Sequence, residues 1–262
     1  EFYLHGNVTV AGTSASEISA DVRIGRGATR TFNVANVTGD AADDLVISGK
    51  IGHYNGISWG YMTKTGAGTL AITGANELGG ATVNAGLLRL DGLNANNAFW
   101  SRGVRLNSTG GLELHKSAGS VSARYRITGG GTGGVTKTGS GRVIHTANHA
   151  YTGDTTIAEG VFQLGSGGSR GSLGNTTVTI DDGATLAYYR NNTMTLANTV
   201  SSSGTGTGSA GGTIEFLGTG NRNQSDYRIG GNSTGFTGSV IIRSGARLGI
   251  DSAAAIGDGT VT

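Results

Sequence analysis

The sequence predicts an all-β protein folded as a right-handed parallel β-helix (β-solenoid) of about ten to twelve rungs. Three observations carry this prediction. Short runs of alternating apolar and polar residues fill the chain, Gly-containing turns separate them, and this strand-turn-strand unit recurs with a period of about 22 residues. Because one such unit cannot bury its apolar face until it stacks on its neighbours, we expect a single β-helix over residues 1–262.

The composition agrees with a folded, strand-rich chain. The 262 residues include 50 Gly but no Pro and no Cys. Gly-rich chains can be disordered, but disordered chains lack the β-branched residues that are abundant here. The absence of Pro suits stacked strands, since Pro removes a ladder hydrogen bond. The absence of Cys excludes disulfides, thiol catalysis and zinc sites built from Cys.

The charge balance argues against two classes of partner. Lys and Arg number 19 against 17 Asp and Glu, so the net charge is only +2. No run of basic residues is present to follow a phosphate backbone, and we expect no nucleic-acid partner. Apolar stretches are only a few residues long, so no helix is expected to span a membrane.

The repeating unit is a short strand, a turn with Gly, and a second short strand. Examples are "VRIGRGATRTFNV" and "VTIDDGATLAYY". Gly is expected at the turns because it adopts a positive φ at little cost. The predicted turn glycines are Gly27, Gly86, Gly111, Gly160, Gly183 and Gly245.

The apolar residues of the alternating runs predict the core. Residues two apart on a strand share a face, so one face of each rung points inward. The predicted core residues are Leu70, Ile72, Val83, Leu88, Leu90, Val143, Ile157, Phe162, Leu164, Val178, Ile180 and Leu186.

Two other all-β folds fit the pattern less well. An antiparallel sandwich has less regular spacing between its strands. A propeller repeats at roughly 40 to 50 residues with an aromatic signature in each blade, whereas only 6% of these residues are aromatic.

A longer pattern recurs above this unit. "KTGAGTLAITGANELGGATVNAGLLRL" spans residues 64–90, "KTGSGRVIHTANHAYTGDTTIAEGVFQL" spans 137–164, and a weaker copy spans 235–250. The first two resemble the passenger-associated transport repeat of bacterial autotransporters. In the first copy the matching residues are Lys64, Thr65, Gly66, Gly68, Leu70, Thr73, Gly74, Asn76, Thr82, Val83, Gly86, Leu88 and Leu90. In the second they are Lys137, Thr138, Gly139, Gly141, Val143, Asn148, Tyr151, Gly153, Thr156, Ile157, Gly160, Phe162 and Leu164.

The resemblance implies a passenger domain of a Gram-negative autotransporter, exported through the periplasm to the cell surface. It implies a translocator barrel in the full-length chain but outside this sequence, and the opening Glu1-Phe2 suggests a piece excised from a longer protein. The repeat says little about the particular activity, but a repeated scaffold without a catalytic constellation predicts adhesion. Self-association with an identical passenger on a neighbouring cell (aggregation, biofilm) is favoured because low net charge leaves little repulsion, and binding of a host surface protein or glycan is the other form. The alternative is a non-catalytic stalk that presents a protease or esterase module lying outside this sequence.

No combination of residues indicates catalysis, a cofactor or a metal. His145 and His149 are expected to be surface residues on a polar strand face, about 13 Å apart and too distant to share a metal unless a turn intervenes. Asp43-Asp44 and Asp181-Asp182 are interpreted as turn residues, since neighbours on a strand point to opposite faces. We therefore expect a protein that is not an enzyme.

The aromatic residues give the better indication of function. "HYNGISWGY", "AFW" and "AYYRNN" interrupt the regular pattern, and exposed Trp, Tyr and Arg are favoured at binding surfaces. The alternative is that these side chains fill wide corners of the β-helix or cap a rung. The candidate binding residues are Tyr54, Trp59, Tyr61, Trp100, Tyr188, Tyr189 and Arg190.

Overall fold

The computed structural model describes residues 2–53, 59–91, 99–203, 211–219 and 226–262. These residues form two compact units. Unit 1 comprises residues 1–115, 123–135 and 150–153, and unit 2 comprises residues 116–122, 136–149 and 154–262. Within the described parts, the only helix is the short 3-10 helix η1 (Ala253–Ala255), and no helix there is long and apolar enough to cross a membrane.

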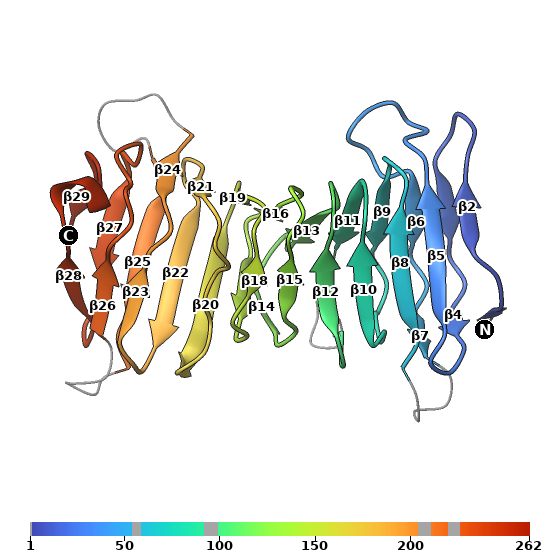
Figure 1. Ribbon diagram of the computed structural model, residues 1–262, viewed down its shortest axis with the longest axis horizontal. Helices are drawn as coiled ribbons and strands as arrows, with labels where there is room; N and C mark the ends of the chain where they lie inside the picture. Colours follow the sequence, from blue (N-terminus) through green and yellow to red (C-terminus); the bar gives the residue numbers. More distant parts are fainter. Residues whose placement is uncertain (1, 54–58, 92–98, 204–210, 220–225) are drawn as a thin grey trace. The chain divides into compact units, whose positions relative to one another are not determined.

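Unit 1 is built from three parallel sheets, whose strands run from blue to yellow-green in Figure 1. The smallest sheet has the order β1 (Phe2–Leu4), β4 (Val22–Ile24), β7 (Ile51–His53). The second contains β2 (Val8–Val10), β5 (Thr29–Val34), β8 (Tyr61–Thr65), β10 (Gly80–Val83), β12 (Gly103–Leu106), β15 (Ile127–Gly129) and β18 (Ala150–Tyr151). The third contains β3 (Ser16–Ile18), β6 (Leu45–Ile47), β9 (Thr69–Ile72), β11 (Leu87–Leu90) and β13 (Gly111–His115).

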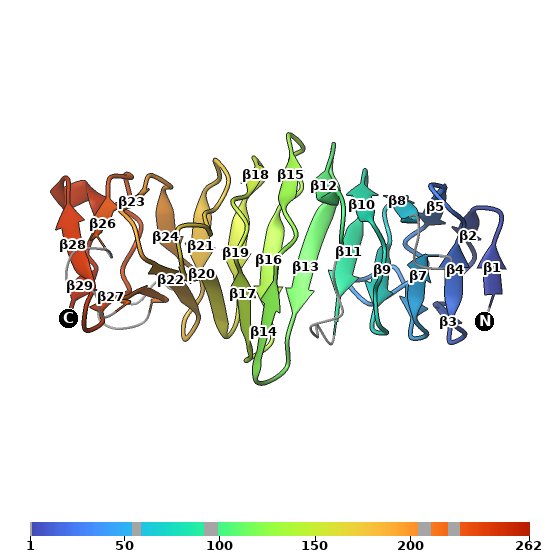
Figure 2. The same cartoon turned by 90° about the horizontal axis from the view of Figure 1, so that it is seen from below.

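Unit 2 repeats this construction, with strands that run from green to red in Figure 2. One sheet contains β16 (Val135–Thr138), β19 (Thr155–Ile157), β21 (Val178–Ile180) and β24 (Val200–Ser202). A second contains β14 (Ser120–Ala123), β17 (Arg142–His145), β20 (Val161–Gly168), β22 (Thr185–Arg190), β25 (Thr213–Leu217), β27 (Ser239–Ile242) and β29 (Thr260–Val261). The last contains β23 (Met194–Leu196), β26 (Asp226–Ile229) and β28 (Arg247–Ile250).

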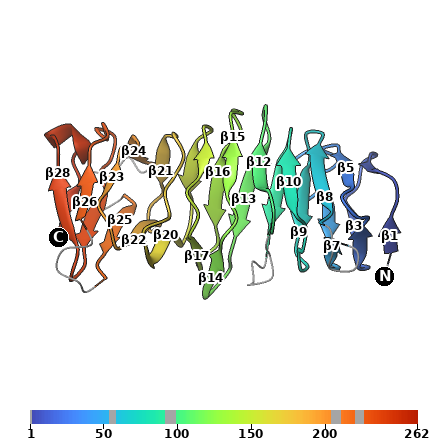
Figure 3. The same ribbon diagram turned by 60° about the horizontal axis from the view of Figure 1, so that its bottom comes forward.

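The predicted parallel β-solenoid is confirmed. As the chain advances it visits the sheets in turn, so that neighbouring strands of a sheet come from successive turns of the chain (Figures 1 and 3). The described strand pairs are parallel, and the chain makes about ten turns. The expectation of one continuous domain over residues 1–262 stays a prediction.

Apolar side chains of successive turns stack in register inside the solenoid. Leu45 pairs with Leu70, Leu70 with Leu88, and Leu88 with Leu112. These four side chains are at most 1% exposed. All twelve predicted core residues are fully buried, so the period-two alternation located the core correctly.

Five of the six predicted turn glycines adopt the positive φ that the turn requires. Gly111 is the exception, because it begins β13. The turn before that strand uses Ser108 at φ 48°, closed by a hydrogen bond of 2.9 Å from the Gly110 amide to the Asn107 carbonyl. Asp181 and Asp182 do precede a turn, since Gly183 follows at φ 74°.

Each long repeat buries a lysine at an inward position. Lys64 on β8 and Lys137 on β16 are 0% exposed. The Lys64 ammonium donates to the carbonyls of Thr65, Gly66 and Ala85 at 3.0, 2.8 and 3.1 Å. Hydrogen bonds to three carbonyls satisfy all three donors of an ammonium group.

Lys137 reproduces this arrangement in the second repeat. Its ammonium donates to the carbonyls of Thr138, Gly139 and Glu159 at 2.7, 2.5 and 3.0 Å. In the first repeat, a Cβ at the turn glycine Gly86 would lie 2.8 Å from the Lys64 ammonium and 2.5 Å from the Gly66 carbonyl. The Lys-Thr-Gly opening and the later turn Gly therefore belong to one ammonium site.

Asp44 completes the surroundings of Lys64. Its buried carboxylate accepts hydrogen bonds from the amides of Val37, Thr38 and Thr69 at 2.7, 2.9 and 2.7 Å. Burial alone would raise the pKa of Asp44, but these hydrogen bonds together hold that pKa below its usual value. The carboxylate thus fastens the loop before β6 to the adjacent turn.

The buried lysines predict a dependence of stability on pH. Burial lowers the pKa of Lys64 and of Lys137 to about 8, which outweighs the opposing attraction of Asp44 and Glu159 respectively. Lys in an unfolded chain titrates near 10.4, so between these values the unfolded chain binds more protons. We therefore expect the free energy of unfolding to rise with pH from about 8 to about 9.5, measured by urea denaturation.

The control for this prediction is the Lys64→Met/Lys137→Met double variant, which should lose the rise. Burial raises the pKa of Tyr227, whose stabilising contribution is lost above pH 10, so the measurement stops below that value. An equal slope in parent and double variant would contradict the assignment to these lysines.

Candidate functional site

Trp59, Tyr61 and Trp100 lie on the first and third of three neighbouring chain segments, which contain Gly60, Gly79 and Ser101 and are joined by hydrogen bonds. The Gly79 amide donates to the Gly60 carbonyl at 2.8 Å, and the Ser101 amide donates to the Gly79 carbonyl at 2.9 Å. Gly79 is required between them, because a Cβ there would lie 2.3 Å from the Trp59 Cβ and 2.8 Å from a Tyr61 ring carbon. The missing side chain lets both aromatic residues pack over this corner.

Two tryptophans and a histidine form an aromatic platform, here defined as His53, Trp59 and Trp100. The indole rings of Trp59 and Trp100 are stacked, with centroids 6.0 Å apart and an interplanar angle of 13°. The His53 ring meets Trp59 edge-on at 4.6 Å, and its Nδ1 lies 2.9 Å from the Glu77 carbonyl. Trp100 is 57% exposed, so the platform presents a large apolar ring to solvent.

A groove of about 360 Å³ lies beside the platform on the outer face of the sheet that contains β8, β10 and β12. Tyr61, Arg102 and Arg105 line it, and we call it the arginine groove. Its hollow follows from the strand register. Tyr61 pairs with Gly80, and Gly80 pairs with Gly103, so two successive strands carry no side chain beside the tyrosine.

Hydroxyl groups line the next outward-facing column of the groove. Thr63 pairs with Thr82, Thr82 with Arg105, and Arg105 with Thr128. Strands in a sheet lie about 4.8 Å apart, so these groups repeat at that interval. The groove therefore offers a regular row of hydrogen-bonding side chains around one guanidinium.

The two arginines of the groove have no acidic partner among the described residues. Arg102 lies over the Tyr61 ring, with its Cζ 4.3 Å from the ring centroid. Arg105 donates from Nε to the Asn107 side-chain oxygen at 2.9 Å. Both positive charges therefore remain available to a ligand.

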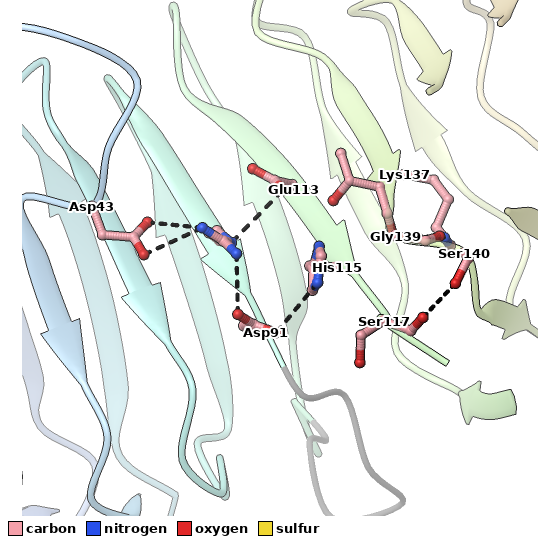
Figure 4. Close-up of polar contacts among 10 residues, drawn as sticks. Asp43, Asp91, Glu113, His115, Ser117, Lys137, Gly139 and Ser140 are labelled. Carbon is pink, nitrogen blue, oxygen red and sulfur yellow. Dashed lines mark hydrogen bonds and ion pairs between the residues drawn. The ribbon is translucent and has the colours of Figure 1, made fainter. Parts of the chain in front are cut away.

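Arg89 shows the opposite situation on the adjoining sheet. Its guanidinium lies 3.2 Å from Asp43, 3.1 Å from Asp91 and 3.7 Å from Glu113. Figure 4 shows these carboxylates gathered around it, with His115 beyond Asp91. This arginine is neutralised within the protein, so this network does not offer a free positive charge.

The structure brings together three of the predicted binding residues, Trp59, Tyr61 and Trp100. Tyr54 lies outside the described residues. Sequence reasoning missed Arg102 and Arg105, although both stand in the short run "WSRGVR" that follows the predicted Trp100. A basic pair beside an aromatic residue was the signal that could have found them.

The other three predicted residues lie in unit 2, where the expectation of exposure is wrong for two. Tyr188 is 1% exposed and stacks on Phe216 with ring centroids 5.7 Å apart. Arg190 is 7% exposed, and its guanidinium donates to the carbonyls of Gly171 and Ser169 at 2.9 and 2.5 Å. Both point inward from β22, whereas Tyr189 between them is half-buried.

The expectation for His145 and His149 is also wrong. They are 0% and 5% exposed, and their rings meet edge-on with centroids 4.8 Å apart. The strand β17 ends at His145, so the chain turns before His149 and brings the two rings together. His145 also packs against Phe162 at 5.6 Å. Among the described residues, no group of three or more His, Asp or Glu is placed to hold a metal ion.

Comparison with known proteins agrees with this architecture. The model of the passenger-associated-transport-repeat family matches residues 62–90 and 135–164, the two ranges that hold the buried lysines. A segment of the adhesin BmaC autotransporter of Brucella suis biovar 1 (strain 1330) is 33% identical over 165 residues. That alignment covers 56% of this chain but only 5% of the adhesin. No solved structure matches the chain.

The repeat matches, the fold and the aligned relative agree with one another. Two matched passenger repeats lie on a parallel β-solenoid, and the aligned relative is an autotransporter. The two matches indicate an exported, cell-surface protein. These similarities support an autotransporter passenger as the kind of protein to which this sequence is related.

Proposed function

We propose that this chain is an adhesive passenger, which binds a macromolecular surface and catalyses no reaction. The observation that carries the proposal is the outward-facing site of unit 1. An exposed aromatic platform adjoins a groove whose two arginines lack acidic partners within the described residues. Aromatic residues and arginine dominate the binding energy of many interfaces. The similarity to a protein described as an adhesin supports the same function.

Adhesion suits a repetitive scaffold for a physical reason. Many copies displayed on one cell make each later contact effectively intramolecular, so weak contacts add up to firm attachment. Self-association with an identical passenger, which low net charge favours, remains one form of this proposal. The arginine groove itself favours a different partner, because two identical faces would oppose their unpaired guanidinium groups.

The test displays the chain on a bacterium that does not otherwise adhere. We expect about tenfold fewer bacteria to attach to host cells when they display Trp100→Ala than when they display the parent, because this exposed ring is the largest apolar contact of the platform. The measurement is a count of attached bacteria at equal display levels. Tyr3→Ala is the matched control, since Tyr3 is 48% exposed but lies outside the platform. Attachment of Trp100→Ala at the parental level would contradict the role of the platform.

The same cells distinguish the alternatives. Settling of displaying cells only with one another, without attachment to host cells, would assign adhesion to self-association. Turnover of a peptide or ester substrate by the purified chain would overturn the proposal that it is not an enzyme. Failure of both adhesion tests would favour a stalk that presents a module encoded elsewhere in the full-length protein.

A further inference from the structure

We propose that the arginine groove binds an acidic polysaccharide, a sugar chain that carries carboxylate or sulfate groups. This inference rests on the proposed adhesive function and names the class of surface molecule that unit 1 takes. It depends on three features of the groove: two arginines without acidic partners among the described residues, a row of threonine hydroxyls, and a hollow beside Tyr61.

The arginines select a negative charge. A guanidinium group binds a carboxylate or sulfate through two parallel hydrogen bonds, which adds geometric specificity to the charge attraction. Arg102 is held over the Tyr61 ring at 4.3 Å, so its position at the wall of the groove is already restricted. Arg105 uses Nε for Asn107, which leaves its terminal nitrogens for a ligand.

The threonines select a polyhydroxylated ligand. Thr63 and Thr82 precede Arg105 in the column and Thr128 follows it, so hydroxyls flank the charge on both sides. Each hydroxyl both donates and accepts, as sugar hydroxyls do. Neighbouring positions of this column lie about 4.8 Å apart, comparable to the length of one sugar residue in an extended chain, so Thr63 and Thr82 are one interval apart and Thr82 and Thr128 are two. An acidic sugar chain lying across the strands would therefore meet hydroxyls and guanidinium groups in register.

The size of the groove fits a short segment of such a chain. Its volume of about 360 Å³ lies within the range of roughly 300–1,000 Å³ that is typical of ligand sites. Gly80 lines the groove beside Tyr61 and contributes no side chain to fill it. A Cβ at Gly80 would lie 2.9 Å from the Arg102 Cβ, so a larger residue there would displace the arginine that lies over Tyr61.

Nucleic acid fits this groove less well. Two arginines neutralise few phosphates, and the chain as a whole has a net charge of only +2. Binding of single strands without sequence preference also uses free aromatic faces for base stacking, whereas Arg102 covers one face of Tyr61. The observations therefore favour the acidic sugar chain, and a nucleic-acid ligand becomes an outcome of the test.

The test measures binding of the purified chain to immobilised heparin, hyaluronate, neutral dextran and single-stranded DNA. We expect binding to heparin or hyaluronate but not to dextran, and a loss of about tenfold in affinity for Arg102→Gln/Arg105→Gln. The matched control is Arg170→Gln/Arg247→Gln, which removes two exposed charges outside the groove and should bind like the parent. The parental interaction should weaken with added salt more steeply than that of the groove variant.

Three outcomes would overturn the inference: equal affinity of groove variant and parent, equal binding of dextran, or preferential binding of DNA that the groove variant abolishes. Circular dichroism of both double variants verifies that they are folded. If displayed cells still attach to host cells while the chain binds no acidic polysaccharide, only this inference fails. If the polysaccharide binds but displayed cells attach neither to host cells nor to one another, the proposed adhesive function fails instead.

Discussion

Leu186→Asp is expected to unfold a large part of unit 2. Leu186 is 0% exposed on β22, where it pairs with Phe162 on one side and Ile214 on the other. Truncating a buried leucine costs about 2–5 kcal/mol, and an unpaired buried charge adds several more. The total is comparable to the whole stability of a typical domain, about 5–15 kcal/mol.

Hydrogen exchange should show where this loss occurs. In a stack of repeats each turn is stabilised mainly by its neighbours, so damage to one turn spreads to those beside it. We expect the amides of β20, β22 and β25 to lose their protection first. The matched control is Thr185→Asp, which places the same charge on the adjacent, outward-facing residue of the strand. Thr185→Asp should change the free energy of unfolding by less than about 1 kcal/mol.

An equal effect of the two substitutions would mean that the inward and outward faces of β22 are assigned wrongly. An unchanged melting transition for Leu186→Asp would contradict the burial of this position altogether. Either result would remove the basis for the stacked core of unit 2.

Lys137→Met is expected to destabilise unit 2 by about 2–4 kcal/mol, although it replaces a charge by an apolar side chain of similar length. The Gly139 and Glu159 carbonyls lose the ammonium donor that contacts them at 2.5 and 3.0 Å. A buried carbonyl left without a donor costs about 1–3 kcal/mol. Relief from burying the charge offsets part of this loss, which is why the expected effect is smaller than that of Leu186→Asp.

Urea denaturation of the intact chain measures this effect, with Lys116→Met as the matched control. Lys116 is only half-buried, so its substitution removes the same charge without opening a buried carbonyl site. We expect the control to change stability by less than about 0.5 kcal/mol. A Lys137→Met protein as stable as the parent would show that the ammonium contributes nothing net, and that the repeat retains this lysine for another reason.

The sequence alone was sufficient for the fold and the apolar core. Val, Ile and Leu at every second position can be satisfied only by a strand with one buried face, because side chains alternate across a strand. Units of about 22 residues are too small to bury that face singly, so stacking follows. Leu70, Phe162 and Leu186 are buried for this reason and no other.

The same alternation also predicts which polar side chains face inward, but the polar character of those residues suggests that they are exposed. Leu186, Tyr188 and Arg190 lie two residues apart on β22, so they share the inward face. His145 follows Val143 in the same way on β17. Reading polar character as exposure placed Tyr188, Arg190 and His145 on the wrong side. Strand register determines whether a side chain points inward or outward. The polarity of the side chain determines only the free-energy cost of burying it.

Partners distant in sequence could be found only from the tertiary structure. Lys64 and Lys137 occupy the same position in the two sequence repeats. Their burial, however, depends on hydrogen bonds to the carbonyls of Ala85 and Glu159, which lie 21 and 22 residues later. The arginine groove likewise exists because Tyr61, Gly80 and Arg105 come from three successive strands. A period-two pattern fixes the face on which each residue lies. Only the packed register determines which residues of neighbouring turns meet there, because turn length and loop length set that register one turn at a time.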